Sequence, residues 1–182
     1  MTAILVPIDK PKGLLMRVAF TMSKRQFGKV LSALQVLYAR KPGLALIAQK
    51  IASMQTKLSL DPEIKALVQV QTARMNGCTF CEDIALAQAY QKSIGVQRFA
   101  QLASCQTSSQ FTDKEKAALA LTEHATRDRK VPDAVWKRVK QYFSEVEIVE
   151  LVWLNASENY FNLQAAVLGL ESNGLAHGGL KR

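Results

Sequence analysis

Apolar residues recur at intervals of three and four positions along most of the chain, which is the spacing of one face of an α-helix. In the first third, the pattern covers residues 13–38, where Gly28 predicts a break near Phe27, and then a segment from Pro42 to about Lys57. No stretch alternates apolar and polar residues between turn dipeptides, so we expect no strands. The pattern predicts an all-α protein.

Helix-start signals divide the rest of the chain. Asp61-Pro62-Glu63 places an acidic N-cap before a proline and a first-turn acid. Thr112–Glu115 and Ser144–Glu147 both match the capping box, in which a hydroxyl and a carboxylate each accept a backbone N–H. The predicted helices of this part span about 61–75, 78–90, 96–103, 113–126, 132–143 and 145–170.

The last predicted helix is apolar around most of its circumference, which is typical of a helix at the centre of a fold or at a subunit interface. Its polar residues form one stripe at helical spacing, made of Asn155, Glu158, Asn159 and Asn162. This stripe can join neighbouring helices or subunits by hydrogen bonds, or it can face a substrate. We favour the hydrogen-bond network, because buried polar groups are normally paired.

A chain of 182 residues with 48% hydrophobic residues can bury the core of one globular domain. We expect residues 1–59 to form a helical N-terminal extension and residues 60–182 the main helical domain, within one folding unit. No apolar run approaches the roughly 20 residues of a membrane-spanning helix, so we expect no membrane contact. Three cysteines without a secretory signal favour a reducing compartment, and we expect a cytoplasmic protein.

The formal charge of +9 is concentrated in the extension. Residues 1–59 contain ten Lys and Arg against one acidic residue, Asp9, whereas the remainder contains fourteen residues of each sign. This asymmetry can mark a surface for nucleic acid, a membrane or an acidic partner, but it more often marks solvated helix faces. The basic residues are dispersed among aromatic residues whose spacing suits packing. We therefore expect solvated faces and no nucleic-acid binding.

The chemistry of the sequence lies in a Cys-x-x-Cys pair, Cys78 and Cys81, at a predicted helix start. There the two sulfurs lie within disulfide distance, and the free N–H groups of the helix favour a thiolate. Cys105 stands alone and the two histidines are isolated, so half of a zinc site is missing and we expect no metal or other cofactor. The alternative is a buried structural pair. The turn formers Asn76 and Gly77 favour an exposed, redox-active pair.

Three segments, Asn76–Cys81, Phe111–Leu121 and Asn159–Leu163, together resemble the carboxymuconolactone decarboxylase family, on the side of its alkyl hydroperoxidase D-like (AhpD-like) members. The resemblance covers about residues 61–170. It implies an AhpD-like helical domain over residues 60–182, assembly into trimers or hexamers, and thiol–disulfide chemistry coupled to peroxide reduction. The decarboxylases of the family work without a Cys pair, so we do not expect decarboxylase activity.

The resemblance is incomplete at the proton relay. AhpD-like members carry a Glu twelve residues before the first Cys and a His four residues after the second, and this chain has Ala66 and Ala85 there. Only Cys78 and Cys81 therefore correspond to the family's catalytic residues. General-base assistance is typically worth about 100-fold or more. We expect a slower or differently activated thiol.

Neighbouring charges offer local substitutes for the relay. Glu82 lies one helical turn after Cys78, and Glu63 lies one turn before Ala66, so either carboxylate is a candidate to move a proton. A carboxylate beside a thiol also disfavours the thiolate, and first-turn acids are common because they suit the helix dipole. Arg74 would favour the thiolate if the turn brings it close.

Two functions fit these observations. The first is an antioxidant thiol–disulfide oxidoreductase of the alkyl hydroperoxidase type, in which Cys78 and Cys81 react with a peroxide or a disulfide and a thiol protein or small thiol restores them. The second is a non-catalytic homo-oligomeric module that retains the fold and uses its basic extension as a docking surface. The Cys pair favours the first.

Overall fold

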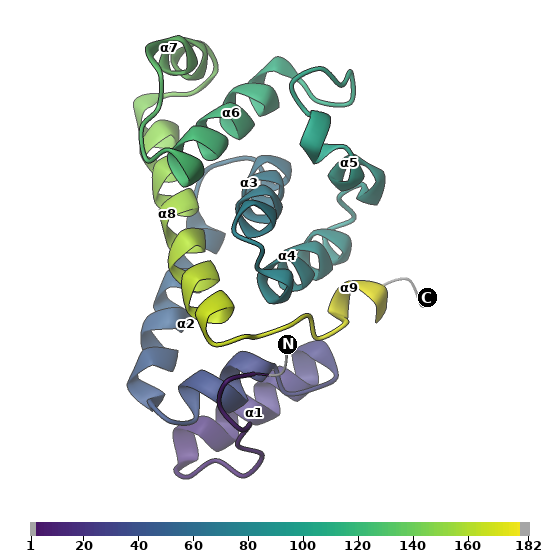
Figure 1. The fold of residues 1–182 in the computed structure, drawn as a ribbon, viewed down its shortest axis with the longest axis vertical. Helices are drawn as coiled ribbons and strands as arrows, with labels where there is room; N and C mark the ends of the chain where they lie inside the picture. Colours follow the sequence, from purple (N-terminus) through teal and green to yellow (C-terminus); the bar gives the residue numbers. More distant parts are fainter. Residues whose placement is uncertain (1–2, 179–182) are drawn as a thin grey trace.

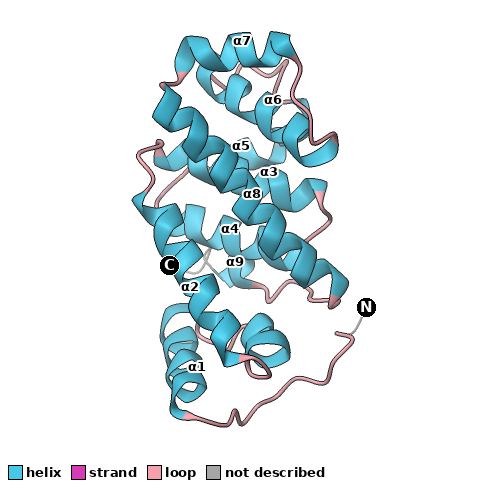
Figure 2. Cartoon of the chain, turned by 90° about the vertical axis from the view of Figure 1, so that its left-hand side faces the viewer, coloured by secondary structure: helices cyan, strands magenta, loops and turns pink. Residues whose placement is uncertain are grey.

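The computed structural model describes residues 3–178, and all regular structure within that range is helical (Figures 1 and 2). The all-α prediction is therefore confirmed. The elements are α1 (Leu14–Phe27), the π-helical turn η1 (Leu34–Tyr38), α2 (Pro42–Lys57), α3 (Pro62–Met75), α4 (Thr79–Gln91), α5 (Val96–Ala100), the 3-10 turn η2 (Leu102–Ser104), α6 (Asp113–Arg127), α7 (Asp133–Tyr142), α8 (Glu145–Val167) and α9 (Leu175–Gly178).

Helix α3 lies at the centre of the main domain, where it packs against α4, α6 and α8 (Figure 1). Its Leu67, Val68 and Val70 are almost inaccessible to solvent. Helix α7 packs on α6 and α8 at one end of the molecule. The extension, with α1, η1 and α2, lies at the other end, and the chain after α8 runs between α1 and α4.

The predicted start signals act as expected. Asp61 accepts a hydrogen bond from the Glu63 backbone N–H at 2.7 Å and begins α3. Both capping boxes form, with Thr112 before α6 and Ser144 before α8. Each cap satisfies N–H groups that the first turn of a helix leaves unpaired, which contributes about 0.5–2 kcal/mol to stability.

The end of α8 differs from the prediction. The helix ends at Val167 and not near Leu170, because Gly169 adopts a φ of +66° that glycine takes without steric cost. The N–H of Leu170 then bonds to the carbonyl of Ala165, and that of Gly169 to the carbonyl of Ala166, which together form a Schellman motif. The chain leaves the helix here and reaches α9, which the pattern did not predict.

The sequence predicted that this helix lies at the centre of the fold or at a subunit interface. Helix α8 does lie at the centre of the fold. Its inner face places Leu151 and Leu154, both fully buried, in a cluster with residues of α3, α6 and α7. Full burial of a leucine stabilises a fold by roughly 1.5–3 kcal/mol. The opposite face of α8 is exposed.

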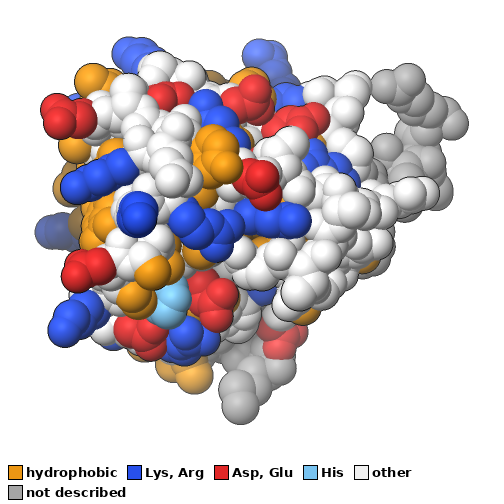
Figure 3. Space-filling model, turned by 90° about the horizontal axis from the view of Figure 1, so that it is seen from above, with side chains coloured by type: hydrophobic (Ala, Val, Ile, Leu, Met, Phe, Trp, Pro, Cys, Tyr) orange, Lys and Arg blue, Asp and Glu red, His pale blue; other side chains and the backbone are white. Residues whose placement is uncertain are grey.

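The extension packs less tightly than the main domain. Helix α1 buries Met16 and Phe20, whereas α2 contains no buried residue. All ten Lys and Arg side chains of the extension are exposed, as the prediction of solvated helix faces requires. At the opposite end of the molecule, formed by α6 and α7, basic and acidic side chains are interspersed (Figure 3). No helix in the described part of the chain is long and apolar enough to span a bilayer.

Candidate functional site: a covered disulfide at the start of α4

The turn between α3 and α4 fixes the position of the first cysteine. Gly77 has a φ of +63°, and its N–H bonds to the Arg74 carbonyl while the N–H of Cys78 bonds to the Ala73 carbonyl. This is the Schellman pattern, so one glycine ends α3 and delivers Cys78 directly to the N-cap of α4. The Asn-Gly sequence before the cysteines therefore sets the position of Cys78 at the start of α4.

Cys78 and Cys81 form a disulfide, with 2.08 Å between the Sγ atoms and 5.3 Å between the Cα atoms. As the N-cap residue, Cys78 also accepts a hydrogen bond from the Cys81 backbone N–H at an N···Sγ distance of 3.2 Å. This N–H and the positive end of α4 both lie at the Cys78 sulfur and favour a charged thiolate, whereas the apolar cluster around the sulfur opposes one. The predicted placement of the pair at a helix start is confirmed.

The expectation that the pair is exposed is wrong. Cys78 is 2% and Cys81 8% exposed, although Gly77 between the two helices is open to solvent. The sulfurs belong to an apolar cluster made by segments distant in sequence. Its other members are Leu31, Ala33 and Val36 from the extension and Ala165, Leu168 and Leu170 at the end of α8, together with Ala3, Ala73, Phe80 and Ile84.

Residues 168–176, which we name the strap, hold this cover in place. Asp83, on the same helix as the cysteines, accepts hydrogen bonds from the N–H groups of Leu175 at 3.0 Å and Ala176 at 2.8 Å. Asn173 accepts a hydrogen bond from the Ser32 backbone N–H, and its carbonyl accepts one from Lys29. The strap is thus tied to both α4 and the extension.

Asp83 has a structural role that the sequence did not reveal. Its burial would raise the pKa of the carboxyl, but the hydrogen bonds from Ala176, Leu175 and Ser172 reverse this and hold the pKa below its ordinary value of 3.8. The carboxylate is therefore ionised at neutral pH and occupied by the strap. The only sequence signal was the turn-forming run Ser172–Gly174, which suggests a bend without naming its partner.

The two alanines at the relay positions lie on adjacent helices. Ala66 of α3 and Ala85 of α4 are each 6% exposed and belong to one apolar cluster with Val70, Phe99 and Leu119. Apolar side chains of the main domain therefore surround the two positions at which AhpD-like members carry the Glu and His of the relay. Cys105 belongs to the same cluster, apart from the disulfide, and burial raises the pKa of its thiol.

The candidate relay substitutes are engaged elsewhere. Glu82 pairs with Arg74, with 2.7 Å between Oε1 and Nε, and Arg74 also donates to the carbonyl of Phe99. Glu63 pairs with Arg98 at 2.6 Å. Neither carboxylate is a free base, and the charge of Arg74 is offset by its partner. Among the described residues, the hydrogen bond at the disulfide comes from the Cys81 backbone N–H, and the two carboxylates are held in ion pairs.

The polar stripe of α8 forms hydrogen bonds between helices, as favoured above. Asn76, directly before the cysteine turn, donates to the side-chain oxygens of Asn159 at 2.9 Å and Asn162 at 3.0 Å. Asn155 donates to the hydroxyls of Thr72 and Thr126. The network fixes the α3–α4 turn against α8, which makes it a support of the disulfide.

Glu158 completes the stripe and ties the extension to the core. Its Oε1 accepts hydrogen bonds from Gln55 of α2 at 2.8 Å and from Gln69 of α3 at 3.0 Å. Burial raises the pKa of Glu158, and the two amide donors only partly oppose that effect. The carboxyl therefore retains its proton at higher pH than an exposed glutamate does.

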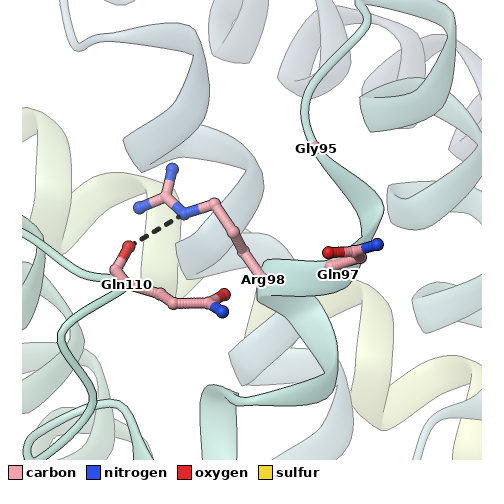
Figure 4. Close-up of a pocket in the computed structure, with 4 residues that line it drawn as sticks. All are labelled: Gly95, Gln97, Arg98 and Gln110. Atoms are coloured by element: carbon pink, nitrogen blue, oxygen red, sulfur yellow. Dashed lines mark hydrogen bonds between the residues drawn. The ribbon is translucent and has the colours of Figure 1, made fainter.

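A shallow pocket elsewhere on the surface is lined by Gly95, Gln97, Arg98 and Gln110 (Figure 4). The guanidinium of Arg98 is occupied, because it donates to the Gln110 carbonyl and pairs with Glu115 as well as with Glu63. Among the described residues, no group of three or more His, Cys, Asp or Glu side chains is arranged to hold a metal ion. The disulfide remains the candidate functional site.

The model of the carboxymuconolactone decarboxylase family matches residues 47–124, which include both cysteines. The uncharacterized protein YdfG of Bacillus subtilis is 30% identical over 113 residues, which are 61% of this chain and 77% of YdfG. The chain belongs to the carboxymuconolactone decarboxylase family. The resemblance seen in the sequence is thus confirmed.

Solved structures with the same fold cover the extension as well as this family domain. The alkylhydroperoxidase AhpD core of an uncharacterized peroxidase-related protein from Ralstonia eutropha JMP134 superposes with a TM-score of 0.76, at 15% identity over 90% of this chain and 91% of that one. The debrominase Bmp8, in its apo form, gives 0.82 at 16% identity over 97% and 96% of the two chains. These likenesses establish an AhpD-like fold that includes the N-terminal helices.

Proposed function

We propose that the protein is an antioxidant thiol–disulfide oxidoreductase of the alkyl hydroperoxidase type, with Cys78 and Cys81 as its catalytic residues. The observation that carries this proposal is the disulfide at the start of α4, where Cys78 is the N-cap and accepts the Cys81 N–H. Family membership and the AhpD-like fold support it. The substrate is an alkyl hydroperoxide or a disulfide.

The reaction would use both sulfurs. A thiolate attacks the terminal peroxide oxygen, the O–O bond breaks, and the departing alkoxide takes a proton to become an alcohol. The attacking sulfur is now a sulfenic acid. The second thiol attacks this sulfur, releases water and forms the disulfide, which a dithiol protein or small thiol reduces by exchange. With Ala85 in place of the relay histidine, the departing oxygen takes its proton from water.

Because the disulfide is covered by the strap and the extension, turnover would require these segments to move. Exchange needs direct access of the reductant's sulfur to one sulfur of the disulfide, and both are buried beneath the strap and the extension. Reduction would therefore follow opening of this cover. We also propose that the protein is cytoplasmic, because thiol reductants are abundant in the cytoplasm.

The experiment is a thiol count after peroxide treatment. The fully reduced protein is exposed to tert-butyl hydroperoxide, unfolded, and titrated for thiols while its intact mass is recorded. We expect the Cys78 and Cys81 thiols to be lost with a mass decrease of about 2 Da, the two hydrogens removed as a disulfide forms. Cys105→Ser is the matched control, since it removes a buried thiol from a different cluster.

Cys78→Ser and Cys81→Ser should each prevent the mass decrease. Oxidation of the wild type no faster than that of free cysteine would contradict the proposal. It would favour the second function, a non-catalytic homo-oligomeric module that docks through its basic extension.

A further inference from the structure

The segments that cover the disulfide are tied down by cations of the extension. Lys29 donates to the Asn173 carbonyl of the strap, with 2.5 Å between the nitrogen and the oxygen. Arg40 donates to the carbonyl of Val36 at 2.6 Å, and Val36 is a fully buried member of the cluster around the sulfurs. Both cations are exposed. The cover of the disulfide therefore carries positive charge on its outer surface.

The end of α1 adds two cations to this surface. Lys24 and Arg25 lie in the last turn of α1 and are exposed. The hydroxyl of Ser23, directly before them, donates to the Lys29 carbonyl and accepts a hydrogen bond from the Leu31 N–H. The end of α1 is thus joined to the segment that covers the sulfurs. With the exposed lysine at the start of α2, these cations form what we name the basic surface, which consists of Lys24, Arg25, Lys29, Arg40 and Lys41.

The basic surface has little negative charge to balance it. Residues 10–60 contain no Asp or Glu, and the strap adds one exposed acid, Glu171. In the main domain, by contrast, cations lie against carboxylates, as Arg98 does with Glu63 and Glu115. A surface with an excess of one sign attracts molecules of the opposite sign and can speed their encounter by about 10- to 1,000-fold. The partner that this surface fits is acidic.

The position of the basic surface indicates what an acidic partner would do. The strap runs between α1 and α4, and it covers the disulfide together with residues 31–36 (Figure 1). A free thiol reaches the sulfurs only if it arrives while the cover is open. A partner docked on the cover stays beside it, at an effective concentration of about a millimolar. Docking therefore favours a dithiol protein over a free thiol of the same reactivity.

We propose that the basic surface binds an acidic dithiol protein, which reduces the disulfide of Cys78 and Cys81 when the cover opens. This inference rests on the thiol–disulfide exchange of the proposed function, and it names the charge and the docking place of the reductant. Since Lys29 and Arg40 belong both to the docking surface and to the ties of the cover, the partner contacts the segments that must move.

The exchange transfers two electrons from the partner. A thiolate of the partner attacks one sulfur of the pair, the disulfide bond breaks, and the other cysteine leaves as a thiolate that takes a proton. This step leaves a mixed disulfide between the two proteins. The second thiol of the partner gives up its proton and attacks the partner's own sulfur in that bond. The remaining cysteine is released as a thiol, and the partner is now a disulfide.

The test compares two dithiol peptides as reductants. Both contain Cys-Gly-Pro-Cys, flanked by glutamates in one peptide and by lysines in the other. Each rate is divided by the rate of the same peptide with 2-hydroxyethyl disulfide, a neutral substrate, which removes the effect of the flanking charges on thiol reactivity. We expect the acidic peptide to be about tenfold faster at about 0.01 M salt. At about 1 M salt the two rates should be nearly equal, because the screening length falls from about 30 Å to about 3 Å. Equal rates at low salt would overturn the proposal.

Two triple variants of equal net charge locate the effect. The first removes three exposed cations of the basic surface and keeps both ties of the cover: Lys24→Gln, Arg25→Gln and Lys41→Gln. The matched control removes three exposed cations at or beside α7, at the other end of the molecule: Lys130→Gln, Lys137→Gln and Lys140→Gln. The preference for the acidic peptide should fall about threefold or more in the first variant and stay within about twofold of wild type in the control. An equal fall in both variants would show that only net charge matters and would overturn the docking surface.

The outcomes separate this inference from the proposed function. A wild type that dithiothreitol reduces and tert-butyl hydroperoxide oxidises again, yet that shows no preference between the peptides, would overturn the docking surface and leave the peroxidase function standing. A preference for the acidic peptide in a protein whose thiols do not react with the hydroperoxide would support the docking surface and contradict the peroxidase function. Binding of a duplex DNA oligonucleotide at about 0.15 M salt, lost in the first variant, would assign the surface to nucleic acid and overturn the proposed partner.

Discussion

The two ends of the α3–α4 pair are both buried, but they are buried in different ways. Around Ala66 and Ala85, the neighbours come from α3 to α6 of the main domain. Around the disulfide, many neighbours come from the extension and the strap, which reach the site from opposite ends of the described chain. Two groups of equally low exposure therefore differ in what covers them. We expect the cover made of peripheral segments to open more easily than the packed core.

The largest effect should come from filling the relay positions. Ala66→Glu with Ala85→His inserts two large polar side chains into a close-packed cluster, so we expect a loss of about 2–5 kcal/mol in the free energy of unfolding. Chemical denaturation measures it. If the variant folds, its restored base should raise peroxide turnover about tenfold, equivalent to roughly 1.4 kcal/mol of barrier.

The matched control for this variant is the same pair of substitutions with Cys81→Ser, which should abolish any gain in turnover. A double variant as stable as wild type would show that the cluster around Ala66 and Ala85 accommodates larger side chains without loss of stability. This cluster would then be no more rigid than the cover over the disulfide. The contrast between the two ends would then be lost.

A smaller effect should follow from loosening the strap. Asp83→Asn keeps the size of the side chain but removes the charge that accepts two backbone N–H groups, and hydrogen bonds to charged groups contribute about 1.5–3 kcal/mol each. We expect the disulfide to be reduced about tenfold faster by dithiothreitol, which corresponds to about 1.4 kcal/mol in the opening of the cover. Asp133→Asn, on exposed α7, is the control. Equal rates for all three proteins would show that the strap does not limit access.

Acid should loosen the strap in the same way. The folded pKa of Asp83 lies below its unfolded value, so its contribution is complete above the ordinary value of 3.8 and is lost as the pH falls through the folded pKa. The advantage of Asp83→Asn in reduction rate should therefore shrink in strong acid. The rate is best followed with a phosphine reductant, which remains active there. An advantage that stays constant down to the acid limit of folding would mean that the charge of Asp83 does not hold the strap.

The smallest effect concerns the tie between α2 and the core. The folded pKa of Glu158 is raised, so wild-type stability falls as the pH rises from the ordinary value of 4.5 through the folded pKa. Glu158→Gln removes that loss. We expect its melting temperature to exceed that of wild type by about 2–4 °C at pH 8, the shift that about 1 kcal/mol produces in a domain of this size, and to match it at pH 4. A variant less stable at pH 8 would show that the carboxylate is needed there.

Local chemistry explains which features the sequence could predict. The starts of α3, α6 and α8 follow from the caps at Asp61, Thr112 and Ser144, because a cap acts on N–H groups within one turn. The Cys pair at a helix start follows in the same way from Gly77. These features need no knowledge of distant residues.

The burial of the disulfide could not be predicted, because its cause is not local. Val36 and Leu170 come from segments far from Cys78 along the chain, and neither carries a signal that names its partner. The same is true of Asp83, whose position near the start of α4 gives no sign that it holds the strap. The Asn-Gly turn did indicate exposure, and Gly77 is exposed, but the sulfurs lie in the apolar cluster beneath it.

The hydrogen bonds from Lys29 and Ser32 to Asn173 join residues 144 and 141 positions apart. Contacts of such long sequence separation form late in folding, since the chain between them must first be ordered. We therefore expect native-state hydrogen exchange to reveal one cooperative unit, made of the strap and residues 29–36, that opens at lower free energy than α3, α6 and α8. During folding, the thiols would then meet oxidants and reductants before this unit closes over them.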